Sequence, residues 1–312
     1  MQHQGEKNMH RPTVLEAAAI GGLGAAPSAS AAATESGSRQ SLRGRRRPHY
    51  VSASDGTKLF VQDWGSGRSI VLLSPWTLNS DIWGTHIVAL TARGFRCVAP
   101  DRRGHGRSEV PTGGYDLDTL ADDVASAIEQ LDLQQVILVA YSMGASEAVK
   151  YLERHGSSRI SRLVLCAPGT PFLLKTEDNP DGIPPAAAEA LVKAIAHDFP
   201  KWIADNEAPF FTPDTITETR SWIKSMMMSV PLPIVLATLI APDLRSAVGK
   251  INLPTLIVQG DNDASNPLPI TGAKTARLIA NCRLVVVEGA PHALVLTHRE
   301  RFLSELLGFI GS

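Results

Sequence analysis

Cysteine, net charge and metal-binding motifs are all scarce in this sequence, and each scarcity excludes a class of protein. Among 312 residues there are only three cysteines, Cys97, Cys166 and Cys282, which are odd in number and widely spaced. Two of them lie inside apolar runs, so we expect buried, inert thiols. No C-x-x-C or H-E-x-x-H spacing occurs, so we expect neither a metal ion nor any other cofactor. The formal net charge of −1 argues against nucleic acid as a partner.

Long apolar runs are absent as well, which excludes a stable transmembrane span. The leader, residues 1–47, instead has a composition of its own, and 13–33 is rich in alanine, glycine and serine. Arg11, this weakly apolar stretch and the small residues at 30–32 resemble a degenerate twin-arginine export signal, with Pro12 in place of the second arginine. Export would place the protein in the periplasm. A disordered leader of no consequence would leave it in the cytoplasm, and both interpretations stay open.

From residue 48 to residue 312, apolar stretches alternate with amphipathic ones. After a hairpin over 50–64, the pattern predicts strands at 69–74, 95–99, 136–140, 162–168, 255–259 and 283–288. Helices are expected between them, at 81–93, 117–131, 145–154, 271–280 and 298–310. Strands that alternate with helices predict one α/β domain with a doubly wound, mostly parallel sheet.

The alternation stops between about 169 and 250, where no clear strand occurs. Proline-interrupted helical patterns lie at 185–203, 215–229 and 233–240. The segment is too long for a plain connection, so we expect a helical cap inserted over the sheet. We expect Phe172 and Trp222 of this cap to line a substrate pocket together with Trp76, which follows the strand at 69–74.

The stretch from Val136 to Arg154 predicts a serine at a sharp turn between a strand and a helix. Such a turn exposes the hydroxyl of Ser142 and needs small residues two places before and after it. Ala140 and Gly144 occupy these places. Most serines near a glycine only cap helices, so a nucleophile also requires a base, an acid and an oxyanion hole elsewhere in the chain.

The base and the acid are predicted after two later strands. His292 follows the strand that ends at 288, and Asp261 and Asp263 follow the strand that ends at 259. The carboxyl ends of parallel strands meet at one edge of a sheet, and the order Ser, Asp, His is one of the known orders of a catalytic triad. An imidazole can take the serine proton, and a carboxylate fixes the imidazole. Asp261 also fits simple turn chemistry, so Asp263, deeper in the loop, is the preferred acid.

The oxyanion hole is expected to consist of two backbone N–H groups. One would come from Met143, the residue after the nucleophile, and the other from the loop that follows the strand at 69–74. Proline has no N–H, so Pro75 is excluded and Trp76 is the candidate. Trp76 also fits a hydrophobic wall of the site.

From about Tyr50 to Ser312 the chain resembles an α/β-hydrolase of the cofactor-free (non-haem) haloperoxidase, perhydrolase and aryl esterase type. The motifs that carry the resemblance are D-G-T-K at 55–58, D-W-G at 63–65, D-R-R-G-H-G-R-S at 101–108, the turn at Ser142, N-P-D-G-I-P at 179–184, G-D-N-D at 260–263 and P-H at 291–292. The resemblance implies a triad of Ser142, Asp263 and His292, with Trp76 and Met143 at the oxyanion hole. It also implies hydrolysis of small esters through an acyl-serine, and transfer of the acyl group to hydrogen peroxide. The resulting peracid would then oxidise halide.

Several residues depart from the pattern of this type. Ser74 and Pro75 replace the usual His-Gly, and alanine replaces glycine at positions 140, 145 and 293. All lie around the expected oxyanion hole and acyl pocket. We hypothesise that Pro75 changes how water and peroxide compete for the acyl-enzyme.

Other functions remain as alternatives. A lactonase or a carbon–carbon bond hydrolase would use the same triad. A non-catalytic binding protein that keeps the fold would explain Ala140 and Pro75, although it would not need Ser142, Asp263 and His292 together. The expected partner is a small acyl substrate, and the sequence leaves open whether the chain forms a homo-oligomer.

Overall fold

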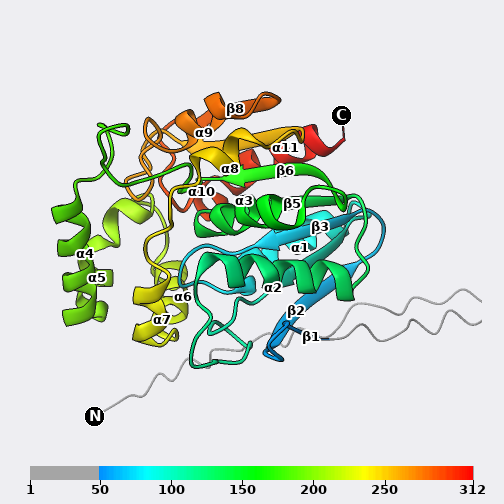
Figure 1. The fold of residues 1–312 in the computed structure, drawn as a ribbon, viewed down its shortest axis with the longest axis horizontal. Coiled ribbons are helices and arrows are strands. Elements are labelled where there is room, and N and C mark those ends of the chain that lie inside the picture. Colours follow the sequence, from blue (N-terminus) through cyan, green and yellow to red (C-terminus); the bar gives the residue numbers. More distant parts are fainter. Residues whose placement is uncertain (1–48, 312) are drawn as a thin grey trace, which may run out of the picture. The chain divides into compact units, whose positions relative to one another are not determined.

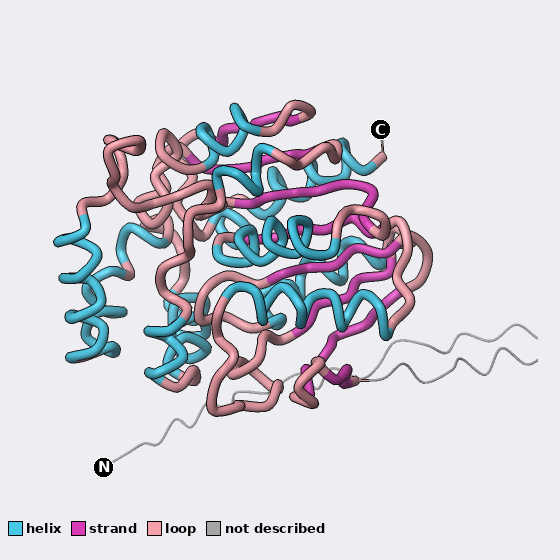
Figure 2. The backbone as a smooth tube through the Cα atoms, in the orientation of Figure 1, coloured by secondary structure: helices cyan, strands magenta, loops and turns pink. Residues whose placement is uncertain are grey.

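The apolar stretches of the sequence form an eight-stranded sheet in the computed structural model, which describes residues 49–311 (Figure 1 and Figure 2). The strands are β1 (Tyr50–Ser52), β2 (Lys58–Gly65), β3 (Ser69–Leu73), β4 (Arg96–Pro100), β5 (Val136–Tyr141), β6 (Ile160–Cys166), β7 (Thr255–Gly260) and β8 (Cys282–Val287). Their order across the sheet is β1-β2-β4-β3-β5-β6-β7-β8. β2 is antiparallel to its neighbours β1 and β4, and all other pairs are parallel. The predicted fold class is confirmed. β1 and β2 form the predicted hairpin, and each strand from β3 to β8 begins and ends within two residues of its predicted bounds.

Helices cover both faces of this sheet (Figure 1). They are α1 (Gly84–Thr91), α2 (Leu117–Gln130), α3 (Met143–His155), α8 (Arg245–Gly249), α9 (Gly272–Leu278), α10 (Leu294–Thr297) and α11 (Arg299–Ile310). The expected helix at 81–93 is a 3-10 turn at Ser80–Trp83 followed by α1, and the short α10 was not expected. One apolar core contains side chains of α2, α3 and α8, and a second contains side chains of α1, α10 and α11.

Strand β5 is the centre of both cores because every one of its side chains is buried. Val136, Leu138 and Ala140 belong to the core on one face, and Ile137, Val139 and Tyr141 belong to the core on the other. Successive side chains of a strand point to opposite faces, so a strand covered on both faces must be apolar throughout. This explains the unbroken apolar run that precedes Ser142.

The order of the strands reverses between β3 and β5. From β3 the chain crosses to β4 on one side, and after α2 it returns to β5 on the other side of β3. In open α/β sheets, ligands bind beyond the carboxyl ends of the strands at such a reversal. Ser142 follows β5 and the loop with Trp76 follows β3, so both candidates lie at this position.

The predicted cap consists of helices that lie together beyond one end of the sheet, on the left of Figure 1. They are α4 (Pro185–His197), α5 (Phe199–Asn206), the 3-10 turn η2 (Ala208–Phe210), α6 (Thr217–Met228) and α7 (Leu232–Ala237). The prediction of one helix over 185–203 was wrong. Asp198 leaves the helical conformation, with φ −154° and ψ 86°, and its side chain accepts a hydrogen bond from the N–H of Lys201. An aspartate in this position starts a new helix, and Pro200 fits its first turn.

The predicted leader at 1–47 lies outside the described residues, so the export signal stays a prediction. All described residues belong to one compact unit. No helix within residues 49–311 is both long enough and apolar enough to cross a bilayer.

Candidate active site

Ser142 lies in a strained turn between β5 and α3. Its backbone has φ 54° and ψ −115°, a conformation that residues other than glycine rarely adopt. Its N–H donates a 2.9 Å hydrogen bond to the carbonyl of Cys166 at the end of β6, which fixes the turn to the sheet. A Cβ atom on Gly144 would lie 2.9 Å from the carbonyl oxygen of Leu73. This position therefore requires glycine, as the strand–turn–helix pattern predicts.

The structure brings Ser142, His292 and Asp263 into one chain of hydrogen bonds. The Oγ of Ser142 lies 2.9 Å from Nε2 of His292. Nδ1 of the same ring lies 2.9 Å and 3.0 Å from the two carboxylate oxygens of Asp263. With Nδ1–H donated to the carboxylate, Nε2 is left as the acceptor of the serine proton. All three residues are buried, with 8%, 4% and 4% of their surface exposed for Ser142, His292 and Asp263.

The two candidate carboxylates occupy different positions. Asp261 is exposed and accepts a 2.7 Å hydrogen bond from the backbone N–H of Gly289, which is the turn chemistry considered for it. Asp263 faces His292, and one of its oxygens also accepts the backbone N–H groups of Ser265 and Asn266 at 3.0 Å and 2.8 Å. These hydrogen bonds stabilise a buried carboxylate in its charged form. The geometry therefore supports Asp263 as the partner of the histidine.

Tyr141, the residue before the nucleophile, helps to position His292. Its hydroxyl donates a 2.8 Å hydrogen bond to the carbonyl of His292, and the two rings lie 5.4 Å apart. Burial raises the pKa of Tyr141 well above its usual value, so the phenol keeps the proton that it donates. Phe210 of the cap also packs against the ring of His292, with the ring centroids 5.5 Å apart. The carbonyl of Phe210 accepts a hydrogen bond from the N–H of Ala293. In the sequence, Tyr141 was only the first residue after the strand predicted at 136–140, and no role was assigned to it.

The two expected oxyanion donors lie at the ends of neighbouring strands. Met143 is the first residue of α3, and Trp76 lies in the loop after β3, where Thr77 has a φ of 60°. In the described part of the chain, neither backbone N–H takes part in a backbone hydrogen bond, so both can donate to a substrate. The indole of Trp76 donates to the carbonyl of Val235 at 3.2 Å and packs edge-on against Phe199. It therefore joins the oxyanion loop to the cap, in keeping with the predicted hydrophobic wall.

A buried ion pair also holds the loop that contains Trp76. The guanidinium of Arg102 donates to the carbonyls of Ser74 and Pro75, at 2.8 Å and 3.2 Å, and pairs with the carboxylate of Glu147 on α3. Burial raises the pKa of Glu147, and the charge of Arg102 opposes this effect. The pair thus connects the loop of Trp76 to the helix that begins after Ser142. The sequence does not reveal this pair, because the two charges lie 45 residues apart and no spacing relates them.

Two residues expected to bind substrate, Phe172 and Trp222, have no described contact with Ser142, Asp263 or His292. Trp222 on α6 is 41% exposed, whereas its neighbour Ile223 is buried. Consecutive helical residues are about 100° apart, so a helix that buries Ile223 turns Trp222 towards solvent. The ring of Phe172 lies under the guanidinium of Arg245, 5.3 Å away, and its described contacts do not include the three buried residues of the site. The expected role of both residues in binding substrate therefore stays a prediction.

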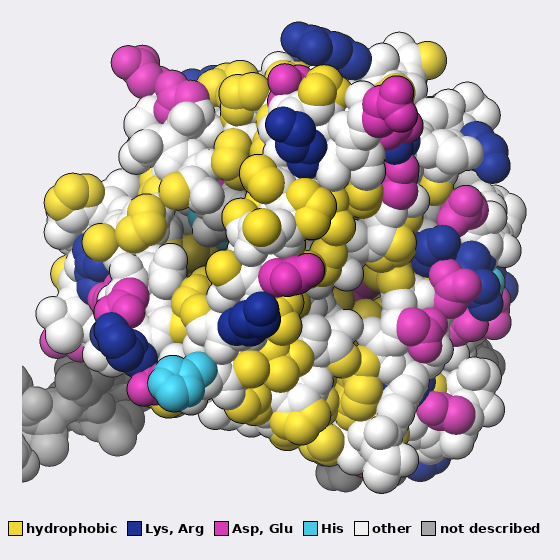
Figure 3. All heavy atoms as spheres, turned by 60° about the vertical axis from the view of Figure 1, so that its left-hand side comes forward, with side chains coloured by type: hydrophobic (Ala, Val, Ile, Leu, Met, Phe, Trp, Pro, Cys, Tyr) yellow, Lys and Arg dark blue, Asp and Glu magenta, His cyan; other side chains and the backbone are white. Residues whose placement is uncertain are grey.

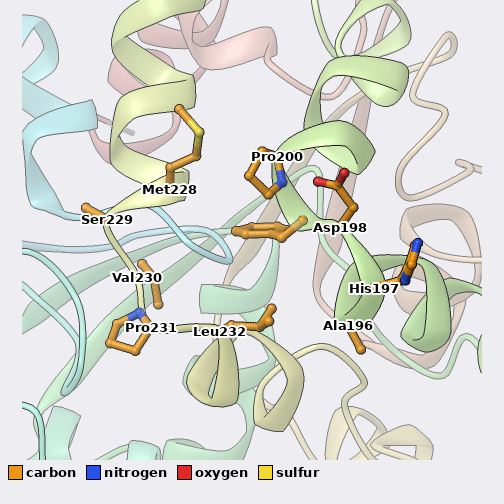
Figure 4. A pocket seen from close by; sticks show the side chains of 10 residues that line it. Ala196, His197, Asp198, Pro200, Met228, Ser229, Val230, Pro231 and Leu232 are labelled. Atoms are coloured by element: carbon orange, nitrogen blue, oxygen red, sulfur yellow. The ribbon is translucent and has the colours of Figure 1, made fainter.

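A pocket of about 490 Å³ lies within the cap (Figure 4). It is an open pocket, lined by the end of α4, the start of α5 and the segment from Met228 to Leu232. Ser142, Asp263 and His292 do not line it, but Phe199 does, and the ring of Phe199 also contacts Trp76. In Figure 3, apolar side chains gather on the face that carries the cap. Within residues 49–311, no three His, Cys, Asp or Glu side chains are grouped as a metal ion would require.

Comparison with known proteins agrees with this geometry. Residues 70–305 match the model of the alpha/beta hydrolase family. A non-heme chloroperoxidase of Kitasatospora aureofaciens is 35% identical over 82% of this chain and 97% of the relative. A bifunctional esterase/perhydrolase of Acinetobacter calcoaceticus is 34% identical over 84% of this chain and 99% of the relative.

Solved structures give the same result. An esterase from Exiguobacterium antarcticum superposes with a TM-score of 0.81 at 31% identity and covers 85% of this chain and 100% of its own. A bromoperoxidase from Bacillus anthracis superposes with a TM-score of 0.80 at 31% identity. It covers 84% of this chain and 100% of its own. The predicted resemblance is thereby confirmed: the chain belongs to the α/β-hydrolase family, and within it to the non-haem haloperoxidase type.

Proposed function

We propose that this protein is a serine esterase that also transfers acyl groups to hydrogen peroxide. The observation that carries the proposal is the continuous hydrogen-bond chain from Ser142 through His292 to Asp263. The relatives named as esterase, esterase/perhydrolase and chloroperoxidase support the same reaction class.

In the first half of the reaction, Oγ of Ser142 attacks the carbonyl carbon of the ester while its proton passes to Nε2 of His292. Asp263 stabilises the imidazolium that forms. The carbonyl oxygen becomes negatively charged and accepts hydrogen bonds from the N–H groups of Trp76 and Met143. The alcohol then leaves with the proton from Nε2, and an acyl-serine remains.

In the second half, a water molecule attacks the carbonyl carbon of the acyl-serine. Its proton passes to His292 and then to Oγ, which leaves as the free hydroxyl, and a carboxylic acid is released. With hydrogen peroxide in place of water, the same proton transfers release a peracid. The peracid passes one oxygen to a halide ion and becomes the carboxylic acid.

The choice between water and peroxide is proposed to depend on the oxyanion loop. The carbonyl of Pro75 accepts hydrogen bonds from Arg102 at 3.2 Å and from the N–H of Leu78 at 3.4 Å, and the ring of Pro75 restricts the backbone before Trp76. We expect Pro75→Gly to loosen this loop and to change the ratio of peracid formation to hydrolysis. The ratio is measured with one ester in the presence of peroxide, and an unchanged ratio would reject this role of Pro75.

The proposal is tested by labelling and turnover together. A fluorophosphonate probe should label Ser142 in the wild-type protein, and a series of p-nitrophenyl esters of increasing acyl length, with and without peroxide, should define the preferred acyl group. Ser146→Ala is a matched control, because Ser146 is a buried serine one helical turn further along α3. It should label like the wild type, whereas folded wild-type protein that neither labels nor turns over esters would refute the proposal.

A further inference from the structure

Asn266 is a buried amide beside the nucleophile that the proposed reaction does not yet use. Its side-chain nitrogen, Nδ2, lies 3.4 Å from Oγ of Ser142 and 2.9 Å from the carbonyl oxygen of Ala167. Only 7% of the residue is exposed. An amide nitrogen carries two hydrogens, so one can bind Ala167 while the other points towards Oγ.

The position of Asn266 is fixed by its backbone. Its N–H donates a 2.8 Å hydrogen bond to a carboxylate oxygen of Asp263, and its carbonyl accepts from the side chain of Gln259. The acceptor of its side chain, Ala167, has a φ of 41° at the end of β6. The carbonyl of Ala167 faces the loop that contains Asp263, because it accepts the hydrogen bond from Asn266 of that loop. A single residue therefore contacts the proposed acid through its backbone and the nucleophile through its side chain.

We propose that Asn266 is a positioning residue that holds the hydroxyl of Ser142 in the orientation needed for attack. The inference rests on the proposed function. When Oγ accepts the long hydrogen bond from Nδ2, its own proton remains free to point at Nε2 of His292, 2.9 Å away. Without this contact, the hydroxyl can rotate about its Cα–Cβ bond and spend less time beside the histidine.

The chemical consequence falls mainly on acylation. Formation of the acyl-serine starts from the free hydroxyl, whose orientation Asn266 controls. After acylation, Oγ carries no proton, and the substrate bound through its carbonyl oxygen restricts the serine side chain. We therefore expect loss of the amide to slow acylation more than deacylation.

The closing experiment compares Asn266→Leu with Asn266→Asp. Leucine has a similar size but cannot donate, and we expect the rate constant for acylation by p-nitrophenyl acetate, from the burst phase, to fall about fivefold, since one hydrogen bond is involved. Aspartate has the same shape but presents acceptor oxygens, which compete with His292 for the serine proton. Asn266→Asp should therefore acylate no faster than Asn266→Leu. Recovery of the wild-type rate in Asn266→Asp would show that only the size of the side chain matters and would overturn the proposal.

Two further measurements separate positioning from general structural damage. The pH midpoint of the acylation rate should be the same in Asn266→Leu and wild type, because the pair of His292 and Asp263 is unchanged. Ser265→Ala is the matched control, because its exposed side chain is removed while its backbone N–H still reaches Asp263. It should acylate at the wild-type rate. A shifted midpoint, or an equal loss in Ser265→Ala, would contradict the proposal.

Failure of the proposed function gives a different result. If the wild-type protein forms no adduct on Ser142, both the proposed function and the role of Asn266 are refuted. An adduct that forms at the same rate in the wild type and in Asn266→Leu refutes the role of Asn266 alone.

Discussion

The carboxyl edge of the sheet and the cap are built in opposite ways. At the sheet edge the three residues of the proposed triad are less than 9% exposed, and hydrogen bonds join them to one another and to the backbone. The cap exposes large apolar side chains instead, namely Ile216, Trp222 and Met228 at 61%, 41% and 51%. Polar groups buried at fixed distances suit chemistry, whereas substitutions of exposed side chains usually have small effects. Variants in the two regions should accordingly differ in the size and kind of their effects.

The largest effect is expected from Ser142→Ala. Loss of the nucleophile should lower kcat/KM for p-nitrophenyl acetate by about 10⁴-fold or more. The melting temperature should change little, because the described hydrogen bonds of the Ser142 side chain are only to His292 and Asn266. The strained backbone at this position is the same for serine and alanine. Steady-state assays and thermal unfolding of the same preparation check both statements. A large fall in melting temperature would instead indicate a structural serine.

The next largest effect is expected from Glu147→Gln. This substitution leaves the buried guanidinium of Arg102 without its carboxylate, and breaking such a pair costs about 3 kcal/mol of unfolding free energy. The loop that carries Trp76 should loosen with it, so ester hydrolysis should also slow.

The cap offers a matched ion pair for this comparison. Lys201 and Asp205 on α5 lie 2.7 Å apart and are 68% and 57% exposed. Asp205→Asn should cost less than about 0.5 kcal/mol. Urea unfolding of both variants measures the contrast, and equal losses in Glu147→Gln and Asp205→Asn would refute it.

An intermediate effect is expected from pH, through a buried histidine on the sheet side. His86 packs between Trp83 and Phe302, and burial together with the charge of Arg299 lowers its pKa to about 4, from 6.5. Below about pH 6.5 the unfolded chain binds a proton that the folded protein does not, so stability falls as the pH decreases towards 4. The loss from this residue is at most roughly 3 kcal/mol.

His86→Phe removes this titration and keeps an aromatic ring in the cluster. The variant should lose less unfolding free energy than the wild type between about pH 7 and pH 4.5, measured by urea unfolding at each pH. Some acid sensitivity should remain, because burial also lowers the pKa of His105, to about 3. Identical pH dependence in the two proteins would show that His86 is not buried in its neutral form.

The smallest effect is expected from Trp222→Ala in the cap. The side chain is 41% exposed and has no described contact with the proposed triad, so the unfolding free energy should change by less than about 0.5 kcal/mol. Turnover of p-nitrophenyl acetate should stay within about twofold of the wild type. A tenfold loss of turnover would show that Trp222 does bind substrate, and it would contradict the contrast between the sheet edge and the cap.

The sequence predicted the sheet edge far better than the cap, for a physical reason. Strands covered on both faces must be apolar, and the turn at Ser142 requires Gly144, so both leave a readable pattern. The loops of Asp263 and His292 follow such strands, and their convergence follows from parallel topology.

Contacts between distant polar residues leave no such pattern. Three examples are the hydrogen bond from Tyr141 to the carbonyl of His292, the ion pair of Arg102 with Glu147 and the hydrogen bond from Asn266 to Ser142. The residues that these contacts join lie 151, 45 and 124 positions apart. In the cap, one non-helical residue, Asp198, divided a helix that periodicity alone had predicted as continuous. The orientation of Trp222 likewise depends on which face of α6 packs inward, and no local pattern determines that face.

The most direct measurement is the mass of the protein during turnover of p-nitrophenyl acetate, after acid quenching within the burst phase. The acyl-serine mechanism predicts an increase by one acetyl group, located on the peptide that contains Ser142 and absent from Ser142→Ala. Turnover of the ester by folded wild-type protein with no acetyl group on Ser142 would contradict the acyl-serine mechanism.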